Sequence, residues 1–236
     1  MTRNRPIVAI DGPAGAGKST VARRLADALA FVLVDTGAMY RAVALAAKRE
    51  GIDWSDGPRL GELAHGLVTK QSLSFERDPG LGVRVKLMNA SGTREDISDA
   101  IRTPDMAQGA SLVSAHSQVR DVLLELQRLA GQGGGVVLEG RDIGTVVFPD
   151  AEVKFFLTAS AEVRASRRHA ELVAKGQTVT LEETLADVKR RDAQDEGRAV
   201  APLKKADGAI LVDSTSLTFE ETVARMLEHV KQAAVS

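Results

Sequence analysis

The residues best suited to chemistry in this sequence are a lysine and a serine at the end of a glycine-rich run near the start of the chain. The run reads G-P-A-G-A-G-K-S-T and fits the spacing G-x-x-x-x-G-K-[ST]. Glycines at these positions let backbone N–H groups turn inward around phosphate oxygens, and a helix that begins there adds its positive dipole end. Lys18 would reach the β- and γ-phosphates of a nucleoside triphosphate, and Ser19 would be a ligand of Mg²⁺. The predicted ATP contacts are Gly12, Pro13, Ala14, Gly15, Ala16, Gly17, Lys18, Ser19 and Thr20.

The sequence on either side of this run has the context that a phosphate loop needs. An apolar stretch from Ile7 to Ile10 precedes it, and Val21 and Leu25 follow at helical spacing. A glycine-rich turn with an exposed lysine is the alternative. The order strand, loop, helix favours the phosphate loop.

Apolar runs typical of buried parallel strands alternate with helical patterns along most of the chain. The strands are expected near residues 7–10, 31–34, 136–138, 153–157 and 209–212. In the middle of the chain, by contrast, apolar and polar residues alternate around a turn signal at Asp78-Pro-Gly80, as in antiparallel strands.

These patterns predict an α/β fold with a P-loop NTPase-type core, in which helices flank a five-stranded parallel sheet. The core is expected to comprise residues 1–59 and 102–236, with a helical, arginine-rich lid at about 160–200. Residues 60–101 are expected to form a small inserted lobe that contains antiparallel strands.

Composition excludes several classes of function. Lys and Arg total 31 against 32 for Asp and Glu, so the chain lacks the basic excess of a general nucleic-acid binder. It has no cysteine for disulfides or thiolate metal sites, and its four histidines do not have metal-ligand spacing. No apolar run approaches bilayer-spanning length, and nothing resembles a secretory signal. We therefore expect a monomeric cytoplasmic protein that acts on small molecules, without nucleic-acid or membrane partners.

Polar residues follow three of the predicted strands. Asp11 comes directly after the first strand, Asp35 after the second and Glu139 after the third. Open α/β sheets bind ligands beyond the carboxyl ends of their strands. Arg41 and Arg141 are candidates to hold a second anionic substrate, because a guanidinium group matches phosphate oxygens bidentately. Taken singly, each could equally form a surface ion pair of little energetic value.

The segment 164–198 holds six arginines and only two lysines. A first group of three arginines begins at Arg164 and shares one helix face. The second group, Arg191, Asp195 and Arg198, has the spacing i, i+4, i+7 on a helix that follows a capping-box sequence. A solvated face with salt bridges along the helix is the alternative. A lid of arginines would stabilise charge in phosphoryl transfer and exclude water.

Two further segments read Asp35-Thr-Gly-Ala-Met-Tyr-Arg41 and Gly140-Arg-Asp-Ile-Gly-Thr-Val-Val-Phe-Pro-Asp150. On these segments the chain resembles the bacterial cytidylate kinases, and the resemblance runs nearly end to end. The resemblance implies that the inserted lobe enlarges the nucleoside-monophosphate-binding domain. It also implies that the acceptor is CMP or dCMP, and it assigns site residues position by position. The implied catalytic residues are Lys18, Arg141, Arg164 and Arg191. The implied acceptor contacts are Asp35, Thr36, Arg41, Ser111, Arg120, Arg141, Asp142, Arg191, Asp195 and Arg198.

The expected activity is direct in-line phosphoryl transfer from MgATP to CMP or dCMP, with no covalent intermediate and no general base. One alternative is the same chemistry on another small acceptor, such as a different nucleotide or shikimate. Another is a regulatory P-loop ATPase, against which stands the lack of an apolar strand ending in an Asp-Glu pair. Two roles stay open for Asp11 and Asp142: contact with Mg²⁺ through water, or fixing neighbouring groups.

Overall fold

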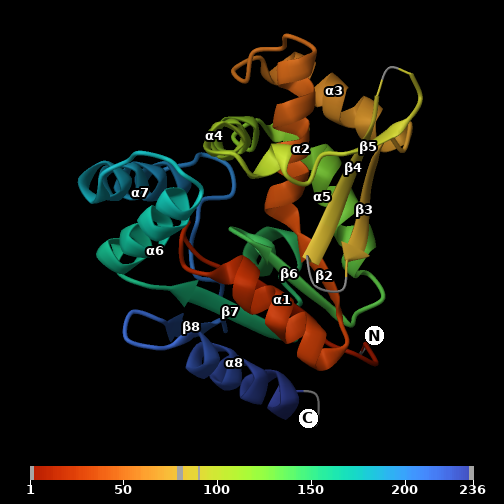
Figure 1. Cartoon of the computed structure of the whole chain (residues 1–236). Helices are drawn as coiled ribbons and strands as arrows, with labels where there is room; N and C mark the ends of the chain where they lie inside the picture. Colours follow the sequence, from red (N-terminus) through yellow and green to blue (C-terminus); the bar gives the residue numbers. More distant parts are fainter. Residues whose placement is uncertain (1–2, 79–81, 90, 234–236) are drawn as a thin grey trace. The chain divides into compact units, whose positions relative to one another are not determined.

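The computed structural model describes residues 3–78, 82–89 and 91–233 of the chain. Helices and strands alternate along most of this length, as Figure 1 shows. The strands are β1 (Ile7–Asp11), β2 (Val32–Asp35), β3 (Leu73–Asp78), β4 (Gly82–Met88), β5 (Arg94–Asp96), β6 (Val136–Gly140), β7 (Val153–Thr158) and β8 (Ile210–Asp213). The α-helices are α1 (Lys18–Leu29), α2 (Thr36–Arg49), α3 (Gly57–Thr69), α4 (Pro104–Val113), α5 (Ser117–Gly131), α6 (Ala161–Ala174), α7 (Leu181–Glu196) and α8 (Phe219–Ala233).

The larger sheet has five strands in the order β2-β6-β1-β7-β8, which confirms the predicted sheet. Strand β1 is parallel to β6 and β7, and β7 is parallel to β8. Every residue of β1 is buried, as its unbroken apolar run predicted. Helices α1 and α8 pack against each other, while α1 also packs on β6 and α8 on β7. The flanking helices of the predicted α/β core are therefore present.

The smaller sheet is antiparallel, with the strand order β3-β4-β5. Strands β3 and β4 correspond to the predicted alternating segments, whereas the short strand β5 was not expected. Its residues, Arg94–Asp96, are all exposed and polar, so they carry no apolar alternation from which a strand could be predicted. Of the predicted turn between β3 and β4, Pro79 and Gly80 lie outside the described residues.

Side-chain caps define where several helices begin. The Thr103 hydroxyl accepts a hydrogen bond from Met106 N at the start of α4, where Pro104 is the first helical residue. Thr180 and Glu183 form a capping box at α7, and Thr218 and Glu221 bond in the same way at α8. These starts agree with the sequence signals.

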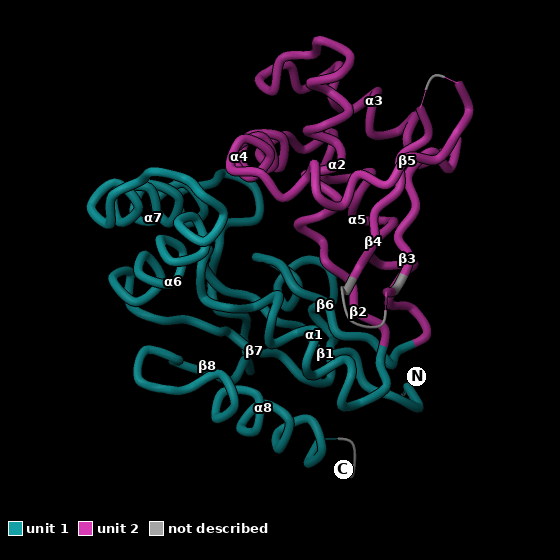
Figure 2. Tube along the Cα trace, in the orientation of Figure 1, with its two compact units in different colours: residues 1–31, 134–236 teal, residues 32–133 magenta. Residues whose placement is uncertain are grey.

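The chain divides into two compact units, coloured separately in Figure 2. Unit 1 comprises residues 1–31 and 134–236, and unit 2 comprises residues 32–133. Unit 1 contains β1, α1, β6 to β8 and α6 to α8, whereas unit 2 contains the antiparallel sheet and α2 to α5. Unit 2 is thus larger than the inserted lobe expected at residues 60–101, and that narrower boundary stays a prediction. Among the described residues, no helix combines the length and apolarity needed to cross a bilayer.

Candidate active site

The loop between β1 and α1 adopts a backbone that only glycine tolerates at its key positions. Gly12, Gly15 and Gly17 have φ values of +149°, +77° and +87°. A Cβ atom on Gly12 would lie 1.9 Å from the backbone oxygen of Leu157 at the end of β7. Helix α1 then begins at Lys18, so its first N–H groups and its positive dipole end belong to the loop. This is the geometry of an anion-binding loop.

Lys18 is buried within this loop. Its Nζ donates a hydrogen bond of 2.7 Å to the backbone oxygen of Pro13. Burial is the main cause that holds the pKa of Lys18 well below its usual value, and the positive charge of Arg141 adds to the effect. Glu139, Asp195 and Asp11 oppose it. A poorly solvated ammonium group of this kind gains strongly from an anionic ligand.

Ser19 meets a carboxylate that the sequence did not single out as a site residue. Its Oγ donates a hydrogen bond of 2.8 Å to Oε2 of the buried Glu139, at the end of β6. A hydroxyl and a carboxylate are hard oxygen donors that suit Mg²⁺, which is usually held by one or two protein oxygens together with substrate phosphates. The described residues contain no cluster of three or more His, Cys, Asp or Glu side chains fit to hold a metal, so no all-protein cage competes with this arrangement. The position of Glu139 at a strand end was the signal in the sequence.

Asp11 ties the phosphate-loop strand to the segment after β6. Register pairs Asp11 with Gly140, and its carboxylate accepts hydrogen bonds from Ile143 N at 2.8 Å and Gly144 N at 2.7 Å. Burial raises the pKa of Asp11 to about 6, against the opposing effect of these two bonds; the nearby charge of Asp142 raises it further. In this structure Asp11 therefore fixes the backbone that follows Arg141 and Asp142.

Asp195 joins two of the expected arginines. Its Oδ2 accepts from Arg141 Nε at 2.7 Å, and its Oδ1 lies 2.6 Å from Arg198 Nη2. Although burial acts to raise the pKa of Asp195, the charges of Arg141 and Arg198 outweigh it and the pKa is lowered. The sequence predicted Arg198 on the same helix as Asp195, which is wrong, because α7 ends at Glu196 with its cap at Gly197. Arg198 lies two residues beyond the end of α7 and still forms its ion pair with Asp195.

Arg191 differs from these arginines. Among the described residues it has no hydrogen-bond partner. Burial lowers its pKa, and the like charge of Arg141 contributes in the same direction. A partly desolvated guanidinium without a fixed partner is suited to binding phosphate oxygens.

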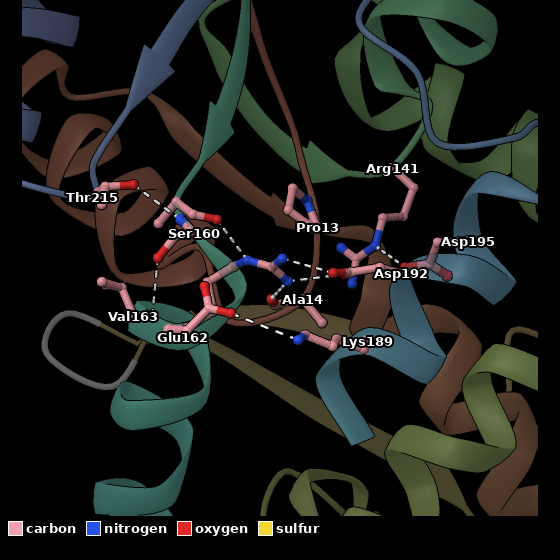
Figure 3. Close-up of polar contacts among 12 residues, drawn as sticks. Pro13, Ala14, Arg141, Ser160, Glu162, Val163, Lys189, Asp192, Asp195 and Thr215 are labelled. Atoms are coloured by element: carbon pink, nitrogen blue, oxygen red, sulfur yellow. Dashed lines mark hydrogen bonds and ion pairs between the residues drawn. The ribbon is translucent and has the colours of Figure 1, made fainter. Parts of the chain in front are cut away.

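Arg164, expected as a catalytic side chain, is held by hydrogen bonds within the protein, and its catalytic role stays a prediction; its partners Asp192 and Ala14 are labelled in Figure 3. Its Nη1 and Nη2 atoms donate to Oδ1 and Oδ2 of Asp192 at 2.9 and 2.6 Å. Its Nη1 also donates to the backbone oxygen of Ala14 at 3.0 Å, and its Nε donates to that of Ala159 at 2.8 Å. Asp192 was not expected from the sequence, because its partner lies 28 positions away and only the packing of α6 on α7 brings the two together.

Unit 2 holds five of the expected acceptor contacts. Asp35 caps α2 by accepting from Ala38 N at 2.9 Å, and its Oδ2 accepts from Arg41 Nη2 at 2.9 Å. The Arg120 guanidinium lies over the Tyr40 ring, 6.0 Å from its centroid, and is buried. The other two residues are Thr36, buried in the first turn of α2, and Ser111 on α4. Helices α2 and α4 pack against each other, so unit 2 gathers these side chains on adjoining elements.

Comparison with known proteins places this geometry in context. Residues 8–232 match the family described as cytidylate kinase. The chain is 56% identical to the cytidylate kinase of Geobacter sp. (strain M21) over 232 residues, which are 98% of this chain and 95% of the relative. It is 53% identical to the cytidylate kinase of Geobacter sulfurreducens over 226 residues, which are 96% of this chain and 93% of the relative.

Proposed function

This chain belongs to the cytidylate kinase family, and we propose that it transfers the γ-phosphoryl group of MgATP directly to CMP or dCMP, giving CDP or dCDP. The observation that carries the proposal is the phosphate loop, whose buried Lys18 bonds to the loop's own carbonyl at Pro13. An ammonium group in that position is ready to exchange a neutral partner for a phosphate oxygen.

The ATP phosphates lie along the residues from Gly12 to Thr20, with backbone N–H groups and Lys18 facing them. Mg²⁺ would be held by Ser19, whose hydroxyl Glu139 supports, and it would supply charge neutralisation to the phosphates. Lys18, Arg141 and Arg191 stabilise the charge that develops on the transferred group.

The acceptor nucleotide is bound by arginine, hydroxyl and carboxylate side chains. The proposed contacts are Asp35, Thr36, Arg41, Ser111, Arg120, Arg141, Asp142, Arg191, Asp195 and Arg198. Asp195 is ionised, because its pKa is lowered, and so it can act only as an acceptor. It accepts from the exocyclic amino group of cytosine, directly or through a partner that can both accept and donate a hydrogen bond. Uracil lacks that donor, and an unpaired buried group costs about 1–3 kcal/mol, so UMP is rejected roughly ten- to a hundredfold.

No general base is required for this reaction, since the acceptor phosphate is already ionised and nucleophilic. The work of the protein is to hold two anions together and exclude water, and residues 160–200 act as the lid that does so. We further propose that the chain works as a monomer in the cytoplasm.

The test is a coupled assay of ADP release from MgATP with CMP, dCMP, UMP, AMP or no acceptor, each at one concentration. The proposal predicts strong turnover with CMP and dCMP, weak turnover with UMP, and negligible turnover with AMP or without acceptor. Release of ADP at the same rate under all five conditions would favour a regulatory ATPase. Faster turnover with a different acceptor would support the same phosphoryl transfer but assign another substrate.

A further inference from the structure

Arg164 stands where three segments of unit 1 meet. It extends from the first turn of α6, its Nε donates to Ala159 O just after β7, and its Nη1 donates to Ala14 O in the phosphate loop. The same guanidinium makes a bidentate pair with Asp192 on α7. These hydrogen bonds engage four of its five N–H groups, and the side chain is only 6% exposed. Figure 3 labels two of its partners, Ala14 and Asp192, with dashed lines marking the contacts.

On the loop side, Arg164 fixes the orientation of one peptide unit. Peptides are planar and trans, so a carbonyl that points toward Arg164 turns the N–H of the next residue the opposite way. The carbonyl of Ala14 therefore sets the direction of the Gly15 N–H, one of the groups available to a phosphate in this loop. Gly15 also packs closely on Arg164: a Cβ atom at Gly15 would lie 3.1 Å from the arginine Cβ.

On the helix side, the bidentate pair fixes the rotation of α7. Asp192 directly follows Arg191 and lies three residues before Asp195, which binds Arg141. A helix held at Asp192 presents both neighbours at defined angles. The guanidinium fork and the carboxylate permit one relative orientation, which a single point charge would not enforce.

We propose that Asp192 is a positioning residue: through Arg164 it couples the phosphate loop to α7, so that nucleotide seated on the loop fixes Arg191 and Asp195 in place. We name the pair the Arg164–Asp192 latch. The inference rests on the proposed function, because Arg191 and Asp195 matter only if the loop and α7 serve one phosphoryl transfer. By linkage, whatever strengthens nucleotide binding to the loop also strengthens the placement of α7.

The structure supplies a matched control. Lys189 and Glu162 also join α7 to α6, but their charged atoms are 3.7 Å apart and their side chains are 59% and 65% exposed. In Figure 3 this pair lies beside the latch, with no dashed contact from it to Pro13 or Ala14. An exposed pair of this kind contributes little. Lys189→Ala removes an ion pair between the same two helices without touching the loop.

The experiment compares the wild type with Asp192→Asn, Asp192→Glu, Arg164→Lys and Lys189→Ala. Amide hydrogen exchange in residues 181–196 is measured with and without Mg²⁺ and a non-hydrolysable ATP analogue. Thermal unfolding, kcat and the KM values for ATP and CMP are measured on the same samples. Arg164→Lys keeps the charge but lacks the fork, so it tests the geometry separately from the charge.

In the wild type and Lys189→Ala, the analogue should slow exchange in α7 by about fivefold or more, a typical coupling between linked sites. In Asp192→Asn and Arg164→Lys this slowing should disappear, and kcat should fall by up to on the order of 10²-fold, as expected for small displacements of catalytic groups. The KM for ATP should change less than kcat, and Asp192→Glu should restore part of both effects.

Equal slowing of α7 exchange in Asp192→Asn and the wild type would overturn the inference. So would a loss of kcat that only tracks the unfolded fraction of each variant. Failure of the proposed function looks different, because the wild type itself would then release no ADP in response to CMP, whatever the exchange measurements give.

Discussion

At the scale of single residues, the site of unit 1 is a set of buried charges whose pKa values depart from their ordinary positions. Lys18 is held below its usual pKa and Asp11 above it, each mainly because it is buried. Both shifts disfavour the charged forms in the free protein. Burying these groups lowers the stability of the ligand-free protein, and the charge of a bound ligand offsets part of that cost.

At Asp11 this effect can be measured as a pH dependence of stability. Its folded pKa of about 6 exceeds that of an unfolded aspartate, so its contribution to stability is fully present below about pH 4 and is lost as pH rises through 6. The difference in unfolding free energy between the wild type and Asp11→Asn should therefore fall by about 2 kcal/mol between pH 4 and pH 7. Denaturant titrations of both proteins without nucleotide measure it. A difference independent of pH would show that Asp11 is not desolvated.

Alanine substitutions at two loop glycines distinguish the cost of a steric clash from the cost of backbone strain. Gly12 and Gly17 both have positive φ, but only at Gly12 would a Cβ atom collide with backbone, whereas at Gly17 nothing lies within 4 Å. Gly17→Ala should cost about 1–2 kcal/mol of stability, and Gly12→Ala more than about 4 kcal/mol. Thermal unfolding of the two variants gives the comparison. Equal costs would mean that the loop can move away from β7.

Much of the site could be predicted at this scale, and the exceptions have a physical cause. The phosphate-loop residues are contiguous, so spacing alone identified them. Glu139 and Asp192 were missed as site residues because their roles depend on partners brought close by packing, Ser19 in one case and Arg164 in the other. The catalytic role expected for Arg164 stays a prediction, and its pairing with Asp192 was not expected.

At the scale of elements, helices α7 and α8 begin with the same kind of capping box but present different side chains. Thr180 with Glu183 starts α7, and Thr218 with Glu221 starts α8. In each box the glutamate N–H donates to the threonine hydroxyl at 3.1 Å, and the threonine N–H donates to the glutamate at 2.8 Å. Helix α7 carries Arg191 and Asp195, whereas α8 covers the sheet beside α1.

Removing each cap should therefore cost similar stability with different consequences for activity. Thr180→Ala and Thr218→Ala should each destabilise the protein by about 1 kcal/mol. Turnover should fall in Thr180→Ala, because α7 positions its side chains less firmly, and stay unchanged in Thr218→Ala. Unfolding midpoints and kcat for both variants measure this. Equal loss of turnover would attribute the effect to general destabilisation and would argue against a special role for α7.

The elements themselves were largely predictable. Buried parallel strands have unbroken apolar runs, and capping residues mark the helix starts, so the five-stranded sheet and the beginnings of α4, α7 and α8 are confirmed. Strand β5 was not predictable, because it is short, polar and exposed. The end of α7 was misplaced because the charge spacing through Arg198 continues past Gly197, where the helix stops.

At the scale of the whole molecule, unit 2 is one continuous stretch of sequence that interrupts unit 1 between residues 31 and 134. The phosphate loop, Glu139, Arg141 and the latch all belong to unit 1. Asp35, Arg41 and Arg120 belong to unit 2, where Asp35 pairs with Arg41 and the Arg120 guanidinium on α5 lies over the Tyr40 ring on α2. The residues proposed to bind ATP are therefore concentrated in one unit, and the family match extends over both. The lobe boundary at residues 60–101 stays a prediction, because the division of the chain at residues 32 and 133 does not locate a smaller lobe within unit 2.

The most direct test of direct phosphoryl transfer to a cytidine nucleotide follows the phosphate itself. ATP labelled in its γ-phosphate is incubated with Mg²⁺, CMP and either the wild type or Lys18→Ala, and the labelled products are separated. The account predicts label in CDP, almost none in inorganic phosphate and none on the protein. In Lys18→Ala the label should stay in ATP while the fold, followed by thermal unfolding, is retained. Label that appears in inorganic phosphate at the same rate with and without CMP, or an unchanged rate in Lys18→Ala, would contradict it.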